Sequence, residues 1–110
     1  MVFDGLVPRD GFYHFGIVAR DFETVLEELG SSIGLEWASI QQRRFPLRQP
    51  NGVVEADFRF TYSRTGPPHY EVVEATPGTI WDPHLAGGIH HLGYWSEDLQ
   101  YDALALAAGW

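Results

Sequence analysis

Two histidines and one glutamate are the residues of this sequence best suited to chemistry. His14 and His91 stand 77 positions apart, and each is followed two positions later by a glycine that would leave space beside the ring. Glu71 lies in the segment HYEVVE, where a carboxylate among apolar residues needs a partner, because burying an unpaired charge is costly. Two imidazoles and one carboxylate suit Zn, Mn, Co, Ni or Fe(II). The sequence therefore predicts a divalent-metal site formed by His14, Glu71 and His91.

The other histidines are weaker candidates for the same chemistry. His90 is expected to point to the sheet face opposite to that of His91 and to be structural, whereas His84 is expected to be exposed in a linker. His69 shares the face of Glu71 but stands at the start of a strand, after two prolines. The sequence has no cysteine, so a metal ligand must come from histidine, a carboxylate, the backbone or water.

The first histidine lies in a predicted strand, residues 11–19, that is rich in aromatic and β-branched residues. Asp21 is typical of a helix N-cap, because its carboxylate can accept the free backbone N–H groups of the first turn. Because side chains alternate along a strand, the neighbours of His14 should face this helix and His14 should point away from it. Gly30 is predicted to end the helix, whose apolar residues recur at helical spacing: Phe22, Val25, Leu26 and Leu29.

Three further strands are expected after this helix. Residues 36–48 and 53–63 are predicted to form a hairpin closed near residues 50–52, where Asn and Gly tolerate positive φ. Its second arm alternates apolar and polar residues, which is typical of a strand with one buried face. Residues 69–75 form the last strand. The sequence therefore predicts an α+β fold in which residues 11–75 make one βαβββ module.

The opening pattern of the chain recurs near its other end. The segment HFGI at residues 14–17 is echoed by HLGY at residues 91–94. Seven positions after each histidine comes an aspartate, Asp21 or Asp98, at the predicted start of a helix. Matches at several equivalent offsets indicate a structural duplication with a period of 77 residues.

The second copy is expected to be a truncated module. Residues 76–88, rich in Pro and Gly, form a predicted linker, and residues 89–110 supply a strand and a helix that ends near Gly109. Residues 1–10 are interpreted as an irregular N-terminal arm. A strand and a helix cannot bury their apolar faces alone, so they must pack on the first module or on another chain.

Composition restricts the class of protein further. A chain of 110 residues with 45% hydrophobic and 15% aromatic residues is long and apolar enough for one folded domain. The net charge of −8 argues against a nucleic-acid partner, which would need clustered Lys and Arg. The sequence lacks a signal-peptide pattern and any apolar run that could span a membrane, so a cytoplasmic protein without a membrane partner is expected.

Taken together, these motifs resemble the vicinal oxygen chelate superfamily. That superfamily includes glyoxalase I, methylmalonyl-CoA epimerase, extradiol dioxygenases and bleomycin-resistance proteins. The resemblance extends over residues 11–110 and is closest to the glyoxalase-like or methylmalonyl-CoA epimerase-like branch. It rests on YHFGIV at residues 13–18 with Asp21, YEVVE at residues 70–74, and GIHHLGY at residues 88–94 with Asp98.

The resemblance implies paired βαβββ modules that curl around one divalent metal, with His14 and Glu71 from the first module and His91 from the second. It also implies metal-assisted proton transfer, of isomerase or lyase type, on a small carbonyl substrate. Glu71 would then be a metal ligand first and could double as the catalytic base. Phe12 and Trp95 are expected to face the enclosed space, where they would suit an apolar ligand or belong to the core.

Two other functions stay open at this point. A non-catalytic protein of the bleomycin-resistance type would bind or sequester a small molecule in the same enclosed space. A purely structural module is favoured only if the metal is absent. The substrate and the identity of the metal are not specified by these motifs.

The family pattern also predicts a fourth ligand on the last strand of the second module, which residues 1–110 do not contain. The sequence is then expected to be either a fragment of a protein of about 155 residues or a short form that completes its site in a homodimer with exchanged strands. An open sheet edge and exposed apolar surface both favour association, so more than a monomer is expected. Activity of the 110-residue form stays open.

Overall fold

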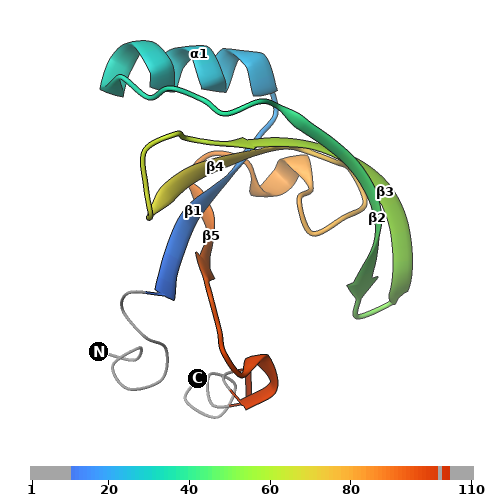
Figure 1. Ribbon diagram of the computed structural model, residues 1–110. Helices are drawn as coiled ribbons and strands as arrows, with labels where there is room; N and C mark the ends of the chain where they lie inside the picture. The colour runs from blue at the N-terminus through green and yellow to red at the C-terminus, as the bar shows by residue number, and fades with distance from the viewer. Residues whose placement is uncertain (1–10, 102, 105–110) are drawn as a thin grey trace.

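The computed structural model describes residues 11–101, 103 and 104. The predicted arm and the predicted helix end at Gly109 lie outside these residues. Within them the chain has a mixed α+β fold, in which a curled five-stranded sheet carries helix α1 on one face (Figure 1). The elements are β1 (Phe12–Ala19), α1 (Phe22–Ile33), β2 (Gln41–Gln49), β3 (Gly52–Tyr62), β4 (His69–Glu74), the short 3-10 helix η2 (Pro83–Leu85), β5 (Ile89–Tyr94) and helical residues at 99–101 and 103–104.

The strand order β2-β3-β4-β1-β5 brings the two halves of the predicted repeat together. Strand β1 pairs with β4 in parallel and with β5 antiparallel, and the pairs β2–β3 and β3–β4 are antiparallel. The first four strands with α1 make the predicted βαβββ module. Strand β5, the repeat of β1, lies directly beside it, so the two histidine strands are neighbours.

The core between α1 and the sheet is formed by the apolar face of an amphipathic helix. Phe22, Ala19 and Val72 are almost fully buried and form its centre. Asp21 caps the helix as predicted, because its carboxylate accepts a hydrogen bond of 3.1 Å from the Thr24 backbone N–H. The remaining apolar side chains pack around this centre: Val25, Leu26, Leu29 and Trp37.

The predicted end of α1 at Gly30 is wrong, because the helix continues to Ile33 and ends at Gly34. Gly34 adopts the left-handed conformation with φ of 73°, which a glycine reaches without the steric penalty of a Cβ, and its backbone N–H donates to the Leu29 carbonyl. Gly30 stays inside the helix, where glycine lowers stability by about 1 kcal/mol relative to alanine. Capping geometry, not the first glycine, therefore sets the helix end.

The predicted hairpin also begins later than expected. Strand β2 starts at Gln41, whereas the sequence pattern placed its start at residue 36. Trp37 forms an isolated bridge with Ser63, and its indole N–H donates a 3.0 Å hydrogen bond to the Leu26 carbonyl of α1. The segment before β2 is therefore tied to the helix, and it pairs with the chain at the end of β3 through a single bridge instead of a continuous ladder.

An ion-pair network fastens α1 to the outer face of the sheet. Arg59 of β3 contacts Glu23 of α1 at 2.6 Å and donates hydrogen bonds to both carboxylate oxygens of Glu74 on β4. Its guanidinium also lies 4.8 Å from the centre of the Phe22 ring. Glu74, which alternation along β4 places on the face opposite Glu71, is thus paired with an arginine.

The second helical segment begins in the same way as the first. Asp98 accepts a 3.0 Å hydrogen bond from the backbone N–H of Tyr101, three residues later, as Asp21 does from Thr24. The equivalent caps support the internal repeat. Within the described residues, no helix has the length and apolar character needed to cross a membrane.

Candidate metal centre

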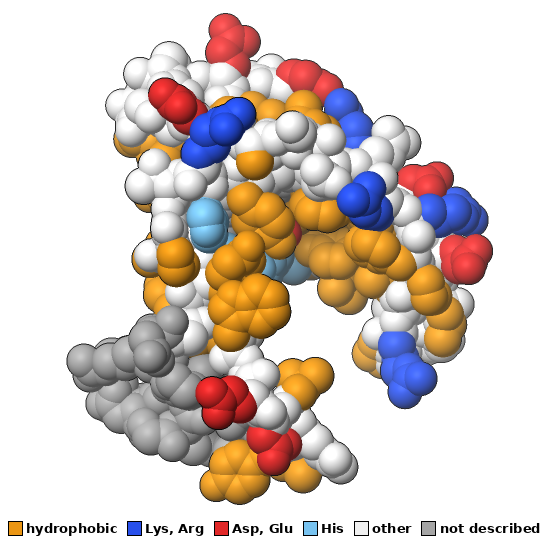
Figure 2. Space-filling view, in the orientation of Figure 1, with side chains coloured by type: hydrophobic (Ala, Val, Ile, Leu, Met, Phe, Trp, Pro, Cys, Tyr) orange, Lys and Arg blue, Asp and Glu red, His pale blue; other side chains and the backbone are white. Residues whose placement is uncertain are grey.

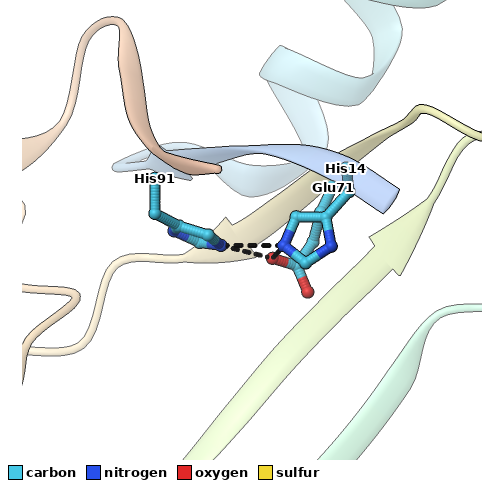
Figure 3. A group of neighbouring side chains, drawn as sticks. All are labelled: His14, Glu71 and His91. Atoms are coloured by element: carbon cyan, nitrogen blue, oxygen red, sulfur yellow. Dashed lines mark hydrogen bonds and ion pairs between the residues drawn. The ribbon is translucent and has the colours of Figure 1, made fainter. Parts of the chain in front are cut away.

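Three neighbouring strands present the three predicted site residues at one place on the sheet. In the backbone register, Gly16 of β1 lies between Glu71 of β4 and His91 of β5. His14 is two residues away from Gly16 on β1 and so lies on the same face. The side chains converge on the side of the sheet opposite α1 (Figure 3). We call this side the hollow face, because the sheet curls around it.

The three polar ends meet closely enough to bind one ion. Nε2 of His91 lies 3.1 Å from Nε2 of His14 and 3.0 Å from Oε1 of Glu71. Nε2 of His14 lies 3.3 Å from the same carboxylate oxygen. Each of these residues offers one ligand atom, and the three atoms lie within 4.8 Å of one another, so within the described part of the chain His14, Glu71 and His91 could together hold a metal ion. We refer to them as the His–Glu–His cluster.

Two glycines allow the imidazoles to meet across the strand boundary. A Cβ added to Gly16 would lie 2.1 Å from the His91 ring, and a Cβ added to Gly93 would lie 2.2 Å from the His14 ring. Each glycine therefore accommodates the histidine of the neighbouring strand. The sequence predicted the open space correctly, but assigned each glycine to the histidine of its own strand.

Burial and neighbouring charges set the protonation of the cluster. Burial lowers the pKa of His14 below its ordinary value of 6.5; the Glu71 carboxylate acts in the opposite direction and does not overcome it. Burial alone would raise the pKa of Glu71, but hydrogen bonds from His91 and Tyr62 and the two nearby imidazoles outweigh it, so the pKa is lowered. At neutral pH the cluster thus has a neutral His14 and an ionised Glu71.

Two β-bulges between β1 and β5 change the direction of side chains that strict alternation along the strands would place on the other face of the sheet. The register shifts between Phe12 and His14, and again between Gly16 and Ile17, so Tyr13 and His90 are the extra residues. His90 was expected to point away from His91. The bulge instead brings the two rings together, with their Nδ1 atoms 2.8 Å apart. Bulges commonly redirect side chains beside functional sites.

Tyr62 is a site residue that sequence analysis missed. It pairs with Glu71 across β3 and β4, and its hydroxyl forms a hydrogen bond with the Glu71 carboxylate. Burial, and then the carboxylate, raise the pKa of Tyr62 well above its ordinary value, so the hydroxyl stays protonated and donates. The alternation along β3 placed Tyr62 on the apolar face. The sequence carried no signal for the register that sets it opposite Glu71.

Most of the chain matches a known protein superfamily in sequence. Residues 13–109 match the sequence pattern of the Glyoxalase/Bleomycin resistance protein/Dioxygenase superfamily. The chain belongs to this superfamily. The match confirms the predicted resemblance to vicinal oxygen chelate proteins and the predicted fold class. No curated protein and no solved structure matches the chain significantly.

The cluster of this vicinal oxygen chelate protein fits the metal that its superfamily typically binds. Adjacent ligand atoms at about 2.0–2.2 Å from one ion are about 2.8–3.6 Å apart in octahedral or tetrahedral geometry. The three separations in the cluster, 3.0, 3.1 and 3.3 Å, lie in this range. Two imidazole nitrogens and one carboxylate oxygen this close together repel one another through their lone pairs unless a proton or a cation lies between them. The donor set and its spacing therefore both suit a divalent metal.

The two predicted ligand-contact residues lie in different places. The Phe12 ring packs 4.9 Å from Phe15 and 5.1 Å from Tyr94, away from the cluster. The Trp95 ring lies 5.1 Å from Tyr13 and is 67% exposed. Figure 2 shows hydrophobic side chains gathered along the hollow beside the β2–β3 hairpin, with histidine deeper within it. Trp95 thus stays a candidate for ligand contact, whereas Phe12 packs with other aromatic residues.

Replacing either glycine beneath an imidazole should disturb the cluster. Gly16→Ala and Gly93→Ala should each displace a histidine ring and lower the free energy of unfolding by about 1–3 kcal/mol through overpacking. Histidine ring resonances in NMR spectra and urea denaturation measure the two effects. Gly30→Ala, the matched control inside α1, should leave the ring resonances unchanged and raise stability by up to about 1 kcal/mol. Unchanged rings in the first two variants would contradict the described packing.

Stability of the metal-free protein should fall as the pH falls. Because the pKa of His14 is lowered from 6.5, the unfolded state binds its proton first, and stability is lost below pH 6.5. The lowered pKa of Glu71 causes a further loss below its ordinary value of 4.5. Urea midpoints measured in chelator from pH 8 to pH 4 test this. His14→Gln should reduce the loss of stability that begins below pH 6.5. If stability instead rises from pH 7 to pH 6, the folded state holds His14 in its charged form.

Proposed function

We propose that this chain is a glyoxalase-like or epimerase-like metalloprotein that catalyses proton transfer, of isomerase or lyase type, on a small carbonyl substrate. One observation carries the proposal, namely the convergence of three ligand atoms within 3.0–3.3 Å of one another on the hollow face. Catalytic metal sites commonly use three protein ligands and keep a position open for water or substrate, whereas structural sites use four.

The residues of the cluster and its neighbour Tyr62 have different roles in this proposal. His14, Glu71 and His91 would hold the ion, which when bound supplies Lewis-acid polarisation of a carbonyl oxygen. The lowered pKa of Glu71 keeps its carboxylate ionised at neutral pH, so it can also accept a proton from carbon. Tyr62 orients this carboxylate through its hydroxyl, and because its pKa is raised it remains a donor.

Aromatic side chains beside the cluster would provide the surface for the substrate. The Tyr62 ring lies 5.5 Å from His14 and 5.7 Å from Tyr13, and Tyr13 in turn contacts the exposed Trp95. Faces of aromatic rings pack well on the apolar part of a small ligand. We therefore propose Trp95, with Tyr13 and Tyr62, as the substrate-facing wall.

The hydrophobic lining of the hollow also supports a second candidate function. A protein of the bleomycin-resistance type would hold an apolar small molecule there without converting it. The two candidates differ in what Glu71 does, because sequestration requires no proton transfer.

Metal binding and proton exchange separate these functions. Metal-free protein titrated with Zn²⁺ or Co²⁺ should bind one ion per chain. His14→Ala, Glu71→Gln and His91→Ala should each weaken binding by more than the roughly 10–100-fold typical of changes outside the ligand set. Loaded protein in D₂O should exchange the proton on the carbon beside the carbonyl of a small hydroxycarbonyl compound, as followed by NMR. Glu71→Gln should slow this exchange by about 10²–10⁴-fold.

The control for metal binding is His84→Ala, because this imidazole is 92% exposed in the linker. It should bind metal as the unchanged chain does. Equal affinity in all the histidine variants would rule out the assigned centre. Metal binding without exchange, accompanied by tight binding of an apolar ligand, would favour sequestration.

We also propose that the chain forms a homodimer, since members of the superfamily often bind small molecules and form dimers. Strand β5 is an edge of the described sheet. Ile89 and Leu92 of β5 are 64% and 42% exposed, and Leu99 just beyond it is 75% exposed. An apolar edge strand favours pairing with a second copy. The cytoplasmic location expected from the sequence stays a prediction.

Light scattering coupled to size-exclusion chromatography tests this association. The unchanged chain should elute with the mass of a dimer, and Leu92→Glu should shift it toward the monomer. Val53→Glu, at a 63% exposed position on the β2–β3 hairpin, is the matched control and should stay dimeric. A monomer at all concentrations, or a shift caused by the control alone, would contradict a dimer through β5.

A further inference from the structure

The bulge at His90 places one imidazole directly behind another. Nδ1 of His90 lies 2.8 Å from Nδ1 of His91, and Nε2 of His90 lies 2.9 Å from the Ile80 carbonyl oxygen. On its other side, His91 directs Nε2 at His14 and Glu71. A continuous line of hydrogen bonds therefore runs from a linker carbonyl, through His90, to a cluster nitrogen.

The carbonyl at the end of this line determines where the protons lie. A carbonyl oxygen only accepts, so Nε2 of His90 must carry a proton and donate it to Ile80. Neutral His90 then has a lone pair on Nδ1, and Nδ1 of His91 must be the donor between the two rings. With the Nδ1 proton of His91 engaged by His90, Nε2, which faces Glu71, is the ring nitrogen that can exchange its proton for a metal.

The acceptor of this line is itself held in place. The Ile80 backbone N–H donates a 3.1 Å hydrogen bond to the Gln49 side chain at the end of β2. The turn is closed by a 2.7 Å hydrogen bond from the Thr76 N–H to the Trp81 carbonyl. The Trp81 ring packs on the buried Phe58 of β3 at 4.5 Å. A segment predicted as a simple linker thus presents a fixed carbonyl to His90.

We infer that His90 is a positioning residue for His91, and that the turn carrying Ile80 is its anchor. The inference rests on the metal centre proposed above. It assigns His90 the task of holding the His91 ring in one orientation and in the Nδ1-protonated form. His14 is held differently, because its Nδ1 is buried without a hydrogen-bond partner among the described residues and its ring is flanked by Tyr13 and Tyr62.

Ring ¹⁵N NMR of the metal-free protein tests the proton positions without any metal. Long-range ¹H–¹⁵N spectra should show His91 with a proton on Nδ1 and His90 with a proton on Nε2 alone. In His90→Ala, the His91 ring should lose its preference for a proton on Nδ1. The tautomer of His91 with its proton on Nε2 alone should then appear. A His91 ring without a proton on Nδ1 in the unchanged chain would overturn the inference.

Metal affinity provides the second measurement. In Co²⁺ titrations, followed by visible absorption, His90→Ala should weaken binding about 10- to 100-fold, as loss of an outer partner of a ligand does. His90→Asn keeps an acceptor oxygen near the position of Nδ1 and should restore most of the affinity. His84→Ala is the matched control and should bind Co²⁺ normally.

The two measurements distinguish failure of the inference from failure of the metal centre. If the unchanged chain binds no Co²⁺ but shows the expected ring protons, the metal centre is wrong and the positioning role of His90 stands. If Co²⁺ binds and His90→Ala binds it equally well, His90 has only a packing role. Equal losses in His90→Ala and His90→Asn would likewise show that the hydrogen bond is not what matters.

Discussion

The structure depends on one close packing arrangement, in which two histidines each lie over a glycine of the neighbouring strand. Paired strands bring opposite Cα atoms to about 4.5–5.5 Å, so a ring can lie across the neighbouring backbone only where the opposite residue has no side chain. The pairs His14–Gly93 and Gly16–His91 satisfy this condition twice. The antiparallel arrangement turns both rings inward, and their Nε2 atoms meet beside the carboxylate of β4.

The glutamates on the two faces of the sheet have different kinds of partner. On the outer face Arg59 joins Glu23 and Glu74 in an ion-pair network close to solvent, where such contacts add little stability. On the hollow face Glu71 is only 8% exposed, and its carboxylate contacts two imidazoles and a tyrosine. A carboxylate buried in this way needs cationic or donor partners, and here they together outweigh burial, which is the largest single influence on the pKa of Glu71.

The sequence predicted the parts of this arrangement that depend on local pattern. The strand and helix order of the first module, the capping role of Asp21, the equivalence of His14 and His91, and their grouping with Glu71 all followed from residue types and periodicity. The helix end at Gly34 and the late start of β2 did not, because both depend on contacts with residues distant in sequence. Tyr62 was missed for a similar reason, since its role depends on the pairing of two strands. His90 was misplaced because a bulge breaks the alternation on which the prediction relied.

The two bulges have a consequence for the identity of the metal ligand. The pairs Phe12–Tyr94 and Ile17–Ile89 share one register, and the residues between them are displaced from it by one position. Each strand contributes one extra residue, Tyr13 in β1 and His90 in β5. The pairing register is therefore shifted only between these two bulges. In the register of the flanks, Gly16 would lie opposite His90. The adjacent histidines are therefore alternative occupants of one position over the glycine, and the paired insertions select which of them faces Glu71 and which stands behind it.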